Sequence, residues 1–185
     1  MNAPLNPPAG KDAVAPDYTR AGPLASDAVL RAQLEDLYAR YAACLDAGLY
    51  DQWPVFFTED CTYKLQPREN FERGLPLCTL SFESRGMLRD RVYGITQTLF
   101  HQPYYQRHAV SGLMVTGQDG PVILAEANYT VVRTRMHEPS ELLSVGRSYD
   151  RVVREAGDTA GELRFAARVF VFDNDLIPNS VIYPI

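Results

Sequence analysis

Apolar and polar residues alternate along four long segments in the second half of the chain. These segments are rich in Val, Tyr, Thr and Phe, and short clusters of Gly, Pro, Asp and Ser separate them: His108–Val115, Pro121–Met136, Leu142–Arg154 and Leu163–Asp173. Connections this short join antiparallel neighbours, and no helical pattern interrupts the series. The sequence therefore predicts a single antiparallel meander.

The last of these segments has a pattern of its own. Under strict alternation one of its faces carries four apolar residues, Phe165, Ala167, Val169 and Val171. Phe170 and Phe172 then fall on the opposite face, so the far end of the strand is predicted to be buried on both sides. An exposed pair of Phe side chains would mark a partner surface, and a helix or the C-terminal tail covering them is the alternative.

The first half of the chain shows helical spacing instead. A cap at Ser26-Asp27 precedes an apolar series that ends before Gly48: Leu30, Leu34, Leu37, Tyr38, Tyr41 and Leu45. An aromatic segment, Asp51–Phe57, follows, and a second amphipathic helix is predicted over Arg85–Leu99. Between them the pattern predicts short strands at Cys61–Gln66 and Leu77–Phe82, joined through a polar loop at Pro67–Gly74.

Helices followed by a long meander predict an α+β fold rather than a parallel α/β winding. Strands of ten or more residues are long for a domain of this size, so the sheet must curl. We expect a strongly curved antiparallel sheet wrapped around the N-terminal helices, in the shape of a cone. Residues 1–26, rich in Pro, Ala and Gly, are expected to form a flexible arm, and residues 27–185 a single domain.

Composition narrows the classes of function. The net charge is −5 and the pI about 5.2, and basic residues are interleaved with acidic ones, which argues against nucleic-acid binding. No apolar run approaches membrane-spanning length, and the start of the chain lacks the pattern of a secretory signal. Cys44, Cys61 and Cys78 fit neither a disulfide framework nor a zinc motif, so we expect buried thiols in the cytoplasm.

Candidate chemistry is sparse. His101, His108 and His137 are expected in a loop, at a strand start and in a turn, so we predict that the chain has no metal site. Tyr41, Asp46, Tyr50 and His108 are the best enzyme-like set, because a helix above a concave sheet could bring them together as an acid–base pocket. The alternative is that these residues are hydrogen-bonded core groups with no catalytic role.

Six short segments occur in a fixed order along the chain: 57–63 (FTEDCTY), 87–92 (MLRDRV), 107–111 (RHAVS), 128–135 (NYTVVRTR), 145–147 (VGR) and 167–173 (ARVFVFD). Together, from about Arg31 to the C-terminus, they resemble the small (beta) subunits of Rieske-type aromatic-ring-hydroxylating oxygenases. The aromatic-acid hydroxylases, which act on salicylate, benzoate or terephthalate, look most similar. The Pro/Ala-rich arm departs from the family pattern.

The resemblance implies a cone of the nuclear-transport-factor-like superfold and a role in aromatic hydrocarbon catabolism. It also implies a hetero-hexamer of three alpha and three beta subunits. In that assembly the alpha subunit carries the Rieske iron-sulfur cluster, the mononuclear iron and the substrate pocket. The beta subunit is then a structural, non-catalytic component of a dioxygenase, with no cofactor of its own.

Two other classes stay open on the residues alone. One is a free-standing dehydratase, isomerase or hydrolase of the same superfold that uses Tyr41, Asp46 and His108, and the other is a ligand-binding module. A cone interior packed with aromatic side chains would favour the subunit, whereas an open pocket containing Asp46 and His108 would favour an enzyme. For self-association as a trimer, we expect Phe170, Phe172, Arg133 and Arg135 to form the interface.

Overall fold

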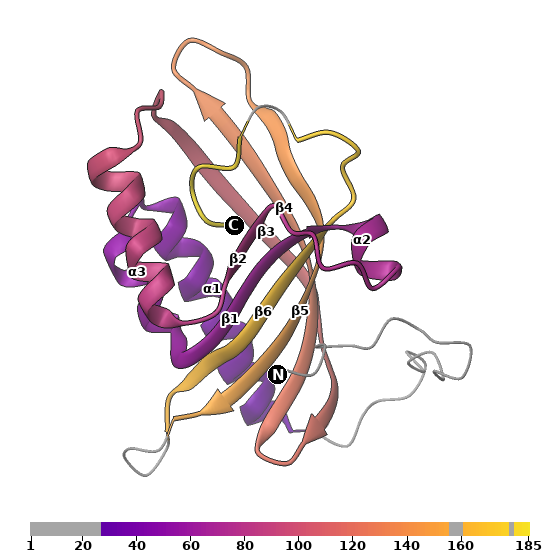
Figure 1. Ribbon diagram of the computed structural model, residues 1–185. Coiled ribbons are helices and arrows are strands. Elements are labelled where there is room, and N and C mark those ends of the chain that lie inside the picture. Colours follow the sequence, from indigo (N-terminus) through magenta and orange to yellow (C-terminus); the bar gives the residue numbers. More distant parts are fainter. Residues whose placement is uncertain (1–26, 156–160, 178–179) are drawn as a thin grey trace.

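The computed structural model describes residues 27–155, 161–177 and 180–185, and the predicted arm of residues 1–26 lies outside them. Helices and strands follow one another in the order α1 (Ala28–Asp46), the 3₁₀ helix η1 (Tyr50–Phe56), β1 (Phe57–Pro67), α2 (Arg68–Glu72), β2 (Leu80–Phe82), α3 (Arg85–Tyr93), the π-helical turn η2 (Gly94–Thr98), β3 (Tyr104–Asp119), β4 (Val122–Arg135), β5 (Glu141–Arg154) and β6 (Leu163–Phe172). Figure 1 shows the long strands crossing the molecule side by side.

Six strands form one sheet in the order β2-β1-β6-β5-β4-β3. β3, β4, β5 and β6 pair with their sequence neighbours in antiparallel fashion, so the predicted meander is confirmed. β1 runs parallel to β6, and β2 pairs antiparallel with β1 at the edge. The first strand thus joins the sheet beside the last one, a long-range pairing that the local sequence pattern did not predict.

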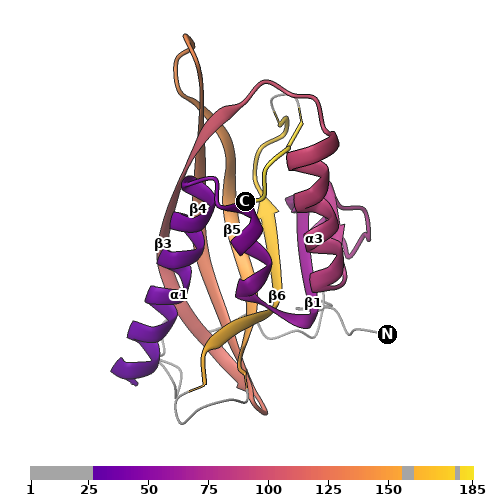
Figure 2. The same cartoon turned by 90° about the vertical axis from the view of Figure 1, so that its left-hand side faces the viewer.

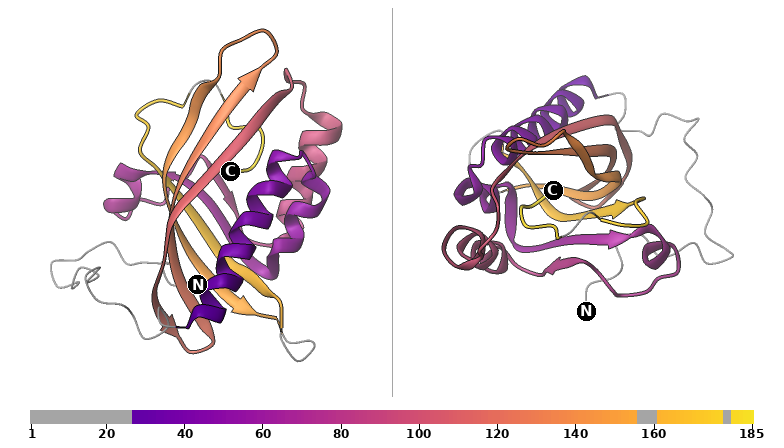
Figure 3. Two further views of the ribbon diagram at one scale, coloured as in Figure 1. Left: turned by 180° about the vertical axis from the view of Figure 1, so that it is seen from behind. Right: turned by 90° about the horizontal axis from the view of Figure 1, so that it is seen from above.

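The sheet curves around the helices. α1 lies along β3 and α3 lies beside β1, both on the same side of the sheet (Figure 2). Seen from above, the strands and helices enclose the C-terminal residues, which lie at the centre of the ring (Figure 3). The predicted cone is therefore observed, and its interior is the main core of the chain.

α1 begins where the sequence predicts. The side chain of Asp27 accepts hydrogen bonds from the backbone N–H groups of Val29 and Leu30, at 3.0 and 3.1 Å, which satisfies donors that a helix start leaves unpaired. The predicted apolar series is buried on the side of α1 that faces the sheet. This helix therefore closes one side of the cone.

β6 contains an irregularity that the alternation pattern missed. Phe165 pairs with Val152 and Ala167 with Arg151, so one extra residue, Ala166, is inserted opposite β5. Such a bulge exchanges the two faces for every later residue. Beyond it Phe170 faces the cone interior together with Phe165, which corrects the predicted assignment of faces, while the prediction that this end is buried on both sides is confirmed.

Three local predictions need adjustment. The expected loop Pro67–Gly74 contains the short helix α2, the strand expected at Leu77–Phe82 is limited to β2, and the helix expected over Arg85–Leu99 changes to π geometry at Gly94. In the described part of the chain no helix is long and apolar enough to cross a membrane. These differences lie at the rim and leave the curved sheet unchanged.

Candidate functional site

Aromatic side chains fill the interior of the cone. Tyr38 meets Phe165 edge to face, with ring centroids 5.4 Å apart, and Trp53 meets Tyr63 at 5.3 Å. Further rings join this cluster from α1, β1, β4 and β6: Tyr41, Phe57, Tyr129 and Phe170. Edge-to-face pairs of this kind stabilise beyond the area that they bury. The space where an enzyme of this shape would hold a substrate is occupied by side chains.

A buried ion pair lies within this aromatic cluster. Nε of Arg168 is 3.5 Å from Oδ1 of Asp150, and the guanidinium carbon of Arg168 lies 4.1 Å from the ring centroid of Tyr41. Tyr38 and Ser148 donate hydrogen bonds to Oδ2 of Asp150, at 2.5 and 2.8 Å. Burial raises the pKa of Asp150, and the positive charge of Arg168 opposes that shift. Oδ1 of Asp150 and the Nε and Nη1 atoms of Arg168 have no hydrogen-bond partner among the described residues, so charge and the surrounding rings hold this part of the pair.

The structure brings Asp46 and His108 together. Nδ1 of His108 lies 2.6 Å from Oδ1 of Asp46, and the same carboxylate accepts the backbone N–H of His108 at 3.1 Å. The imidazole is buried, and its Nε2 has no hydrogen-bond partner among the described residues. The pair fastens the end of α1 to β3 and does not present a base to solvent.

Tyr41 and Tyr50, the other members of the predicted acid–base set, point elsewhere. The Tyr41 hydroxyl donates to the carbonyl of Ile185 at 2.6 Å and accepts from Nε1 of Trp53 at 3.1 Å. The ring of Tyr50 stacks on Tyr183, with centroids 4.7 Å apart. Burial raises the pKa of Tyr41 well above its ordinary value, so its hydroxyl stays neutral. The four residues do not form one pocket.

A surface groove of about 590 Å³ runs between α1 and the edge strand β3. Its walls combine small residues of the helix with polar residues of both elements, among them Ala39, Ala42, Ala43, Asp46, His108 and Ser111. Nε2 of His108 is buried beneath this surface and does not open into the groove. The two carboxylates on its walls are already paired, Glu35 with Arg31 at 3.0 Å and Asp46 with His108 at 2.6 Å.

Phe170 and Phe172, which the sequence placed at a subunit interface, are core residues of the chain itself. Their side chains are 2% and 5% exposed, and the Phe170 ring lies between Tyr63 and Tyr129. The premise that they form an exposed flank is wrong, because the bulge in β6 turns them inward. The structure thus favours the alternative in which other parts of the chain cover them.

Arg133 and Arg135, the other predicted interface residues, are also engaged within the chain. Arg133 is 2% exposed and lies 2.7 Å from the Glu141 carboxylate, with its guanidinium over the Tyr104 ring. Nη1 of Arg135 lies 3.0 Å from Glu141 and 3.1 Å from Glu138. Whether Arg135, which is partly exposed, also meets a partner subunit stays a prediction.

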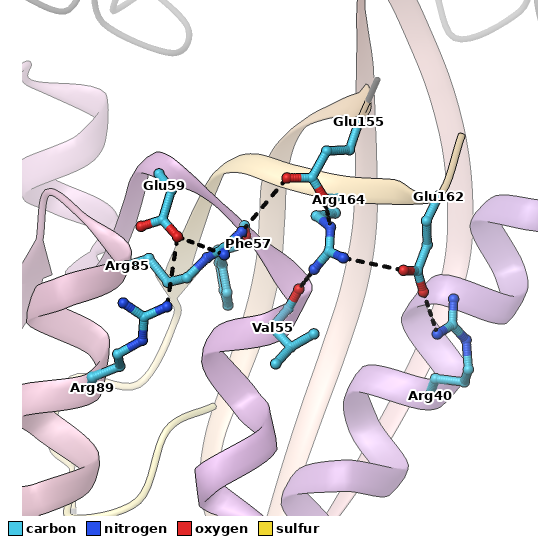
Figure 4. Close-up of polar contacts among 9 residues, drawn as sticks. All are labelled: Arg40, Val55, Phe57, Glu59, Arg85, Arg89, Glu155, Glu162 and Arg164. Carbon is cyan, nitrogen blue, oxygen red and sulfur yellow. Dashed lines mark hydrogen bonds and ion pairs between the residues drawn. The ribbon is translucent and has the colours of Figure 1, made fainter. Parts of the chain in front are cut away.

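Charged side chains and two backbone carbonyls, those of Val55 and Phe57, form a network at the other end of the cone. Figure 4 shows its members: Arg40, Val55, Phe57, Glu59, Arg85, Arg89, Glu155, Glu162 and Arg164. Arg85 binds the Glu59 carboxylate at 2.7 Å and a backbone carbonyl of β1, while Arg164 bridges Glu155, Glu162 and the end of η1. Each of these two guanidinium groups is already paired, so the network is a structural clamp and not an anion site.

No group of three or more His, Cys, Asp or Glu side chains in the described part of the chain could hold a metal ion. His108 is engaged with Asp46, and Nε2 of His101 lies 2.8 Å from the Tyr183 hydroxyl. The three cysteines are free thiols. The residues present do not fit an iron-sulfur cluster or a mononuclear iron.

Comparison with known proteins identifies relatives of one kind. A family model described as ring hydroxylating beta subunit matches residues 40–179. The anthranilate 1,2-dioxygenase small subunit of Burkholderia cepacia is 36% identical over 149 residues, which cover 80% of this chain and 90% of that protein. A terephthalate 1,2-dioxygenase terminal oxygenase subunit, beta 1, of Comamonas sp is 25% identical over 83% of this chain and 97% of its own length.

A solved structure agrees with these sequence matches. A beta subunit from Novosphingobium aromaticivorans, assigned to an aromatic-ring-hydroxylating dioxygenase, superposes with a TM-score of 0.74 and is 30% identical. The match covers 84% of this chain and 95% of the other. The similarity confirms the predicted nuclear-transport-factor-like α+β cone.

Proposed function

The chain belongs to the ring-hydroxylating beta subunits and is therefore the small subunit of an aromatic-ring-hydroxylating oxygenase, within which we propose that it has a purely structural role. The filled cone interior is the observation that carries this proposal. Aromatic rings and the Asp150–Arg168 pair occupy the volume that a substrate would need. The Asp46–His108 pair, the strongest sign of an enzyme, holds α1 against β3 with its free nitrogen buried.

We further propose that the redox centres belong to the large subunit. The described residues contain no group of three or more metal-binding side chains, and His101 and His108 are engaged with Tyr183 and Asp46, which supports an assignment of the Rieske cluster and the mononuclear iron to the alpha partner. These groups supply electron transfer and oxygen activation when bound there. This chain would contribute the scaffold that holds the large subunits in place.

We propose an aromatic acid as the substrate of the assembled enzyme. The relatives matched by sequence are named for anthranilate and terephthalate, which are both aromatic carboxylic acids. The site that distinguishes these acids would lie in the large subunit. The sequence of this chain therefore supports the class of substrate and not the individual compound.

Exposed apolar side chains gather at one end of the sheet and are the best candidates for a subunit interface. Tyr105 pairs with Thr134 near the start of β3, Met136 follows β4, and Phe100 precedes β3, all three with exposed side chains. Tyr105 and Met136 are 68% and 67% exposed, and exposed apolar residues that lie together mark interaction surfaces, whereas scattered single ones do not. We propose that this end of the sheet contacts another subunit in a hexamer of three large and three small chains.

Co-expression with the large subunit tests the proposal. The purified complex should contain equal numbers of both chains, with a native mass equal to three of each, and the small chain isolated alone should retain no stoichiometric iron. Met136→Glu should lower the yield of complex, whereas Val29→Glu, at a position that is 68% exposed beside the end of β5 and the start of β6, should not. A small chain that retains iron, or that never associates with a large subunit, would refute the structural role.

The three free thiols support a reducing compartment, so we propose that the enzyme works in the cytoplasm. The described residues also support a single domain over residues 27–185. One sheet and one connected core link α1 near the start of this range with Ile185 at its end. Limited proteolysis that releases a stable fragment beginning near residue 27 would agree with this boundary.

A further inference from the structure

Residues 181–185 lie inside the cone and are held much as a bound peptide is held. Nη2 of Arg91, on α3, donates to the carbonyl oxygens of Val181 and Ile182, at 3.0 and 2.7 Å. Nε2 of Gln106, on β3, lies 3.4 Å from the carbonyl of Pro184. The backbone of this segment thus receives hydrogen bonds from side chains of the surrounding wall, rather than extending the sheet.

The end of the segment is the most deeply bound part. Ile185 is fully buried, and its carbonyl oxygen accepts hydrogen bonds from the hydroxyls of Tyr41 and Tyr63, at 2.6 and 3.2 Å. The N–H of Ile185 donates to the Tyr63 hydroxyl at 3.0 Å. Two tyrosines from different elements therefore fix both backbone groups of one residue.

Tyr183 anchors the middle of the segment. Its ring stacks between Tyr50 and Tyr104, with centroid distances of 4.7 and 4.4 Å, and its N–H donates to the Tyr104 hydroxyl at 3.3 Å. Nε2 of His101 lies 2.8 Å from the Tyr183 hydroxyl. Side chains from α1, α3, η1, β1 and β3, and from the segment before β3, therefore converge on one short peptide.

We propose that the cone interior is a peptide-binding site, which residues 181–185 occupy as an intramolecular ligand. Without them the donors of Tyr41, Tyr63 and Arg91 would line an apolar cavity with no acceptor, which is unfavourable for buried polar groups. The site selects an extended peptide that offers carbonyl oxygens to Arg91, Gln106 and the two tyrosines and places an apolar side chain in the core beside Tyr41 and Tyr63. This inference does not depend on the structural role in the oxygenase.

The test uses the full chain with a protease-cleavage sequence inserted before Ser180. After the folded protein is cut, the hexapeptide Ser-Val-Ile-Tyr-Pro-Ile should dissociate on extensive dialysis and rebind saturably at one per chain. Trp53, the single tryptophan, reports the exchange because its Nε1 donates to the Tyr41 hydroxyl, which binds Ile185. A peptide carrying Ile185→Ala should bind at least about thirtyfold more weakly, equivalent to ~2 kcal/mol, and a scrambled peptide should not bind.

Two results would overturn the proposal: the cut protein unfolds once the peptide leaves, or the peptide never exchanges. Either result would show that the segment is an integral part of the core. A second measurement uses uncut full-length variants. Ile185→Ala should increase acrylamide quenching of Trp53 fluorescence, whereas Leu176→Ala, at an exposed position, should leave it unchanged. Equal quenching in the two variants would also contradict the proposal, whatever the outcome of co-purification with the large subunit.

Discussion

Neutralising one member of the buried Asp150–Arg168 pair should destabilise the chain much more than the pair itself contributes. The two side chains are 0% and 2% exposed, and Nε of Arg168 lies 3.5 Å from Oδ1 of Asp150. At an effective dielectric constant of about 20 the attraction across this distance is about 5 kcal/mol, before the cost of desolvation is subtracted. Removal of one partner leaves the other charge buried and uncompensated.

We therefore expect Asp150→Asn and Arg168→Met each to lower the free energy of unfolding by about 3–5 kcal/mol. Asparagine keeps an oxygen that can accept the hydrogen bond of Tyr38, so the first variant mainly removes charge. The double variant should lose less than the sum of the two single losses, with a coupling energy of about 2 kcal/mol.

Urea unfolding at pH 7, followed by the fluorescence of Trp53, measures these energies. Protein concentration must be held constant, because subunit association adds to the apparent stability. The matched control is the surface pair Arg151–Asp119, whose charged atoms lie 2.8 Å apart and whose side chains are 29% and 67% exposed. The control cycle should give about 0.2–1 kcal/mol. Additive losses in the buried cycle, or a coupling no larger than in the control, would refute the reasoning.

Three further predictions concern the sheet and its core. Gly146→Ala should prevent normal pairing of β5 with β6, because a Cβ atom there would lie 1.9 Å from the carbonyl oxygen of Val171. The control is Gly117→Ala, where the nearest atom is 3.7 Å away and the midpoint of thermal unfolding should match that of the wild type. Equal midpoints for the two variants would contradict the prediction. Burial raises the pKa of Tyr63 to about 12, so the folded state favours the neutral hydroxyl. This preference contributes about 3 kcal/mol to the free energy of unfolding. The contribution is complete below pH 10 and should be lost as the pH rises through 12. Urea titrations between pH 9 and pH 12 should show a shallower decline for Tyr63→Phe than for the wild type, and parallel declines would disprove it. Phe170→Asp would place an unpaired charge in the core and should yield insoluble chain even without a partner subunit, so recovery of a soluble, folded monomer would contradict the burial of this ring.

Local patterns predicted the elements that depend on local interactions. The cap at Asp27 and the apolar spacing of α1 are properties of neighbouring residues, and the meander follows from short turns between alternating segments. The parallel pairing of β1 with β6 could not be predicted in this way, because it joins residues about a hundred positions apart and leaves no mark on either strand.

The interior was less accessible to prediction from sequence. One inserted residue, Ala166, reverses which side of β6 faces the core, so Phe170 and Phe172 were assigned to the wrong face. Asp150 gave no signal of its burial, since a polar residue in an alternating strand normally faces solvent. The sequence offered Asp46 and His108 as members of a possible pocket; the structure brings these two together, and the buried position of the free imidazole nitrogen follows from packing alone.

The turnover number per assembled iron centre in a complex containing His108→Ala tests the structural role of this chain most directly. Loss of the Asp46–His108 contact should lower stability by about 1–3 kcal/mol and reduce the yield of complex. The complex that does assemble should hydroxylate its aromatic substrate at the wild-type rate, because the imidazole takes no part in the reaction. A loss of about a hundredfold in turnover with assembly and iron content intact, the size expected for removal of a general base, would contradict the account.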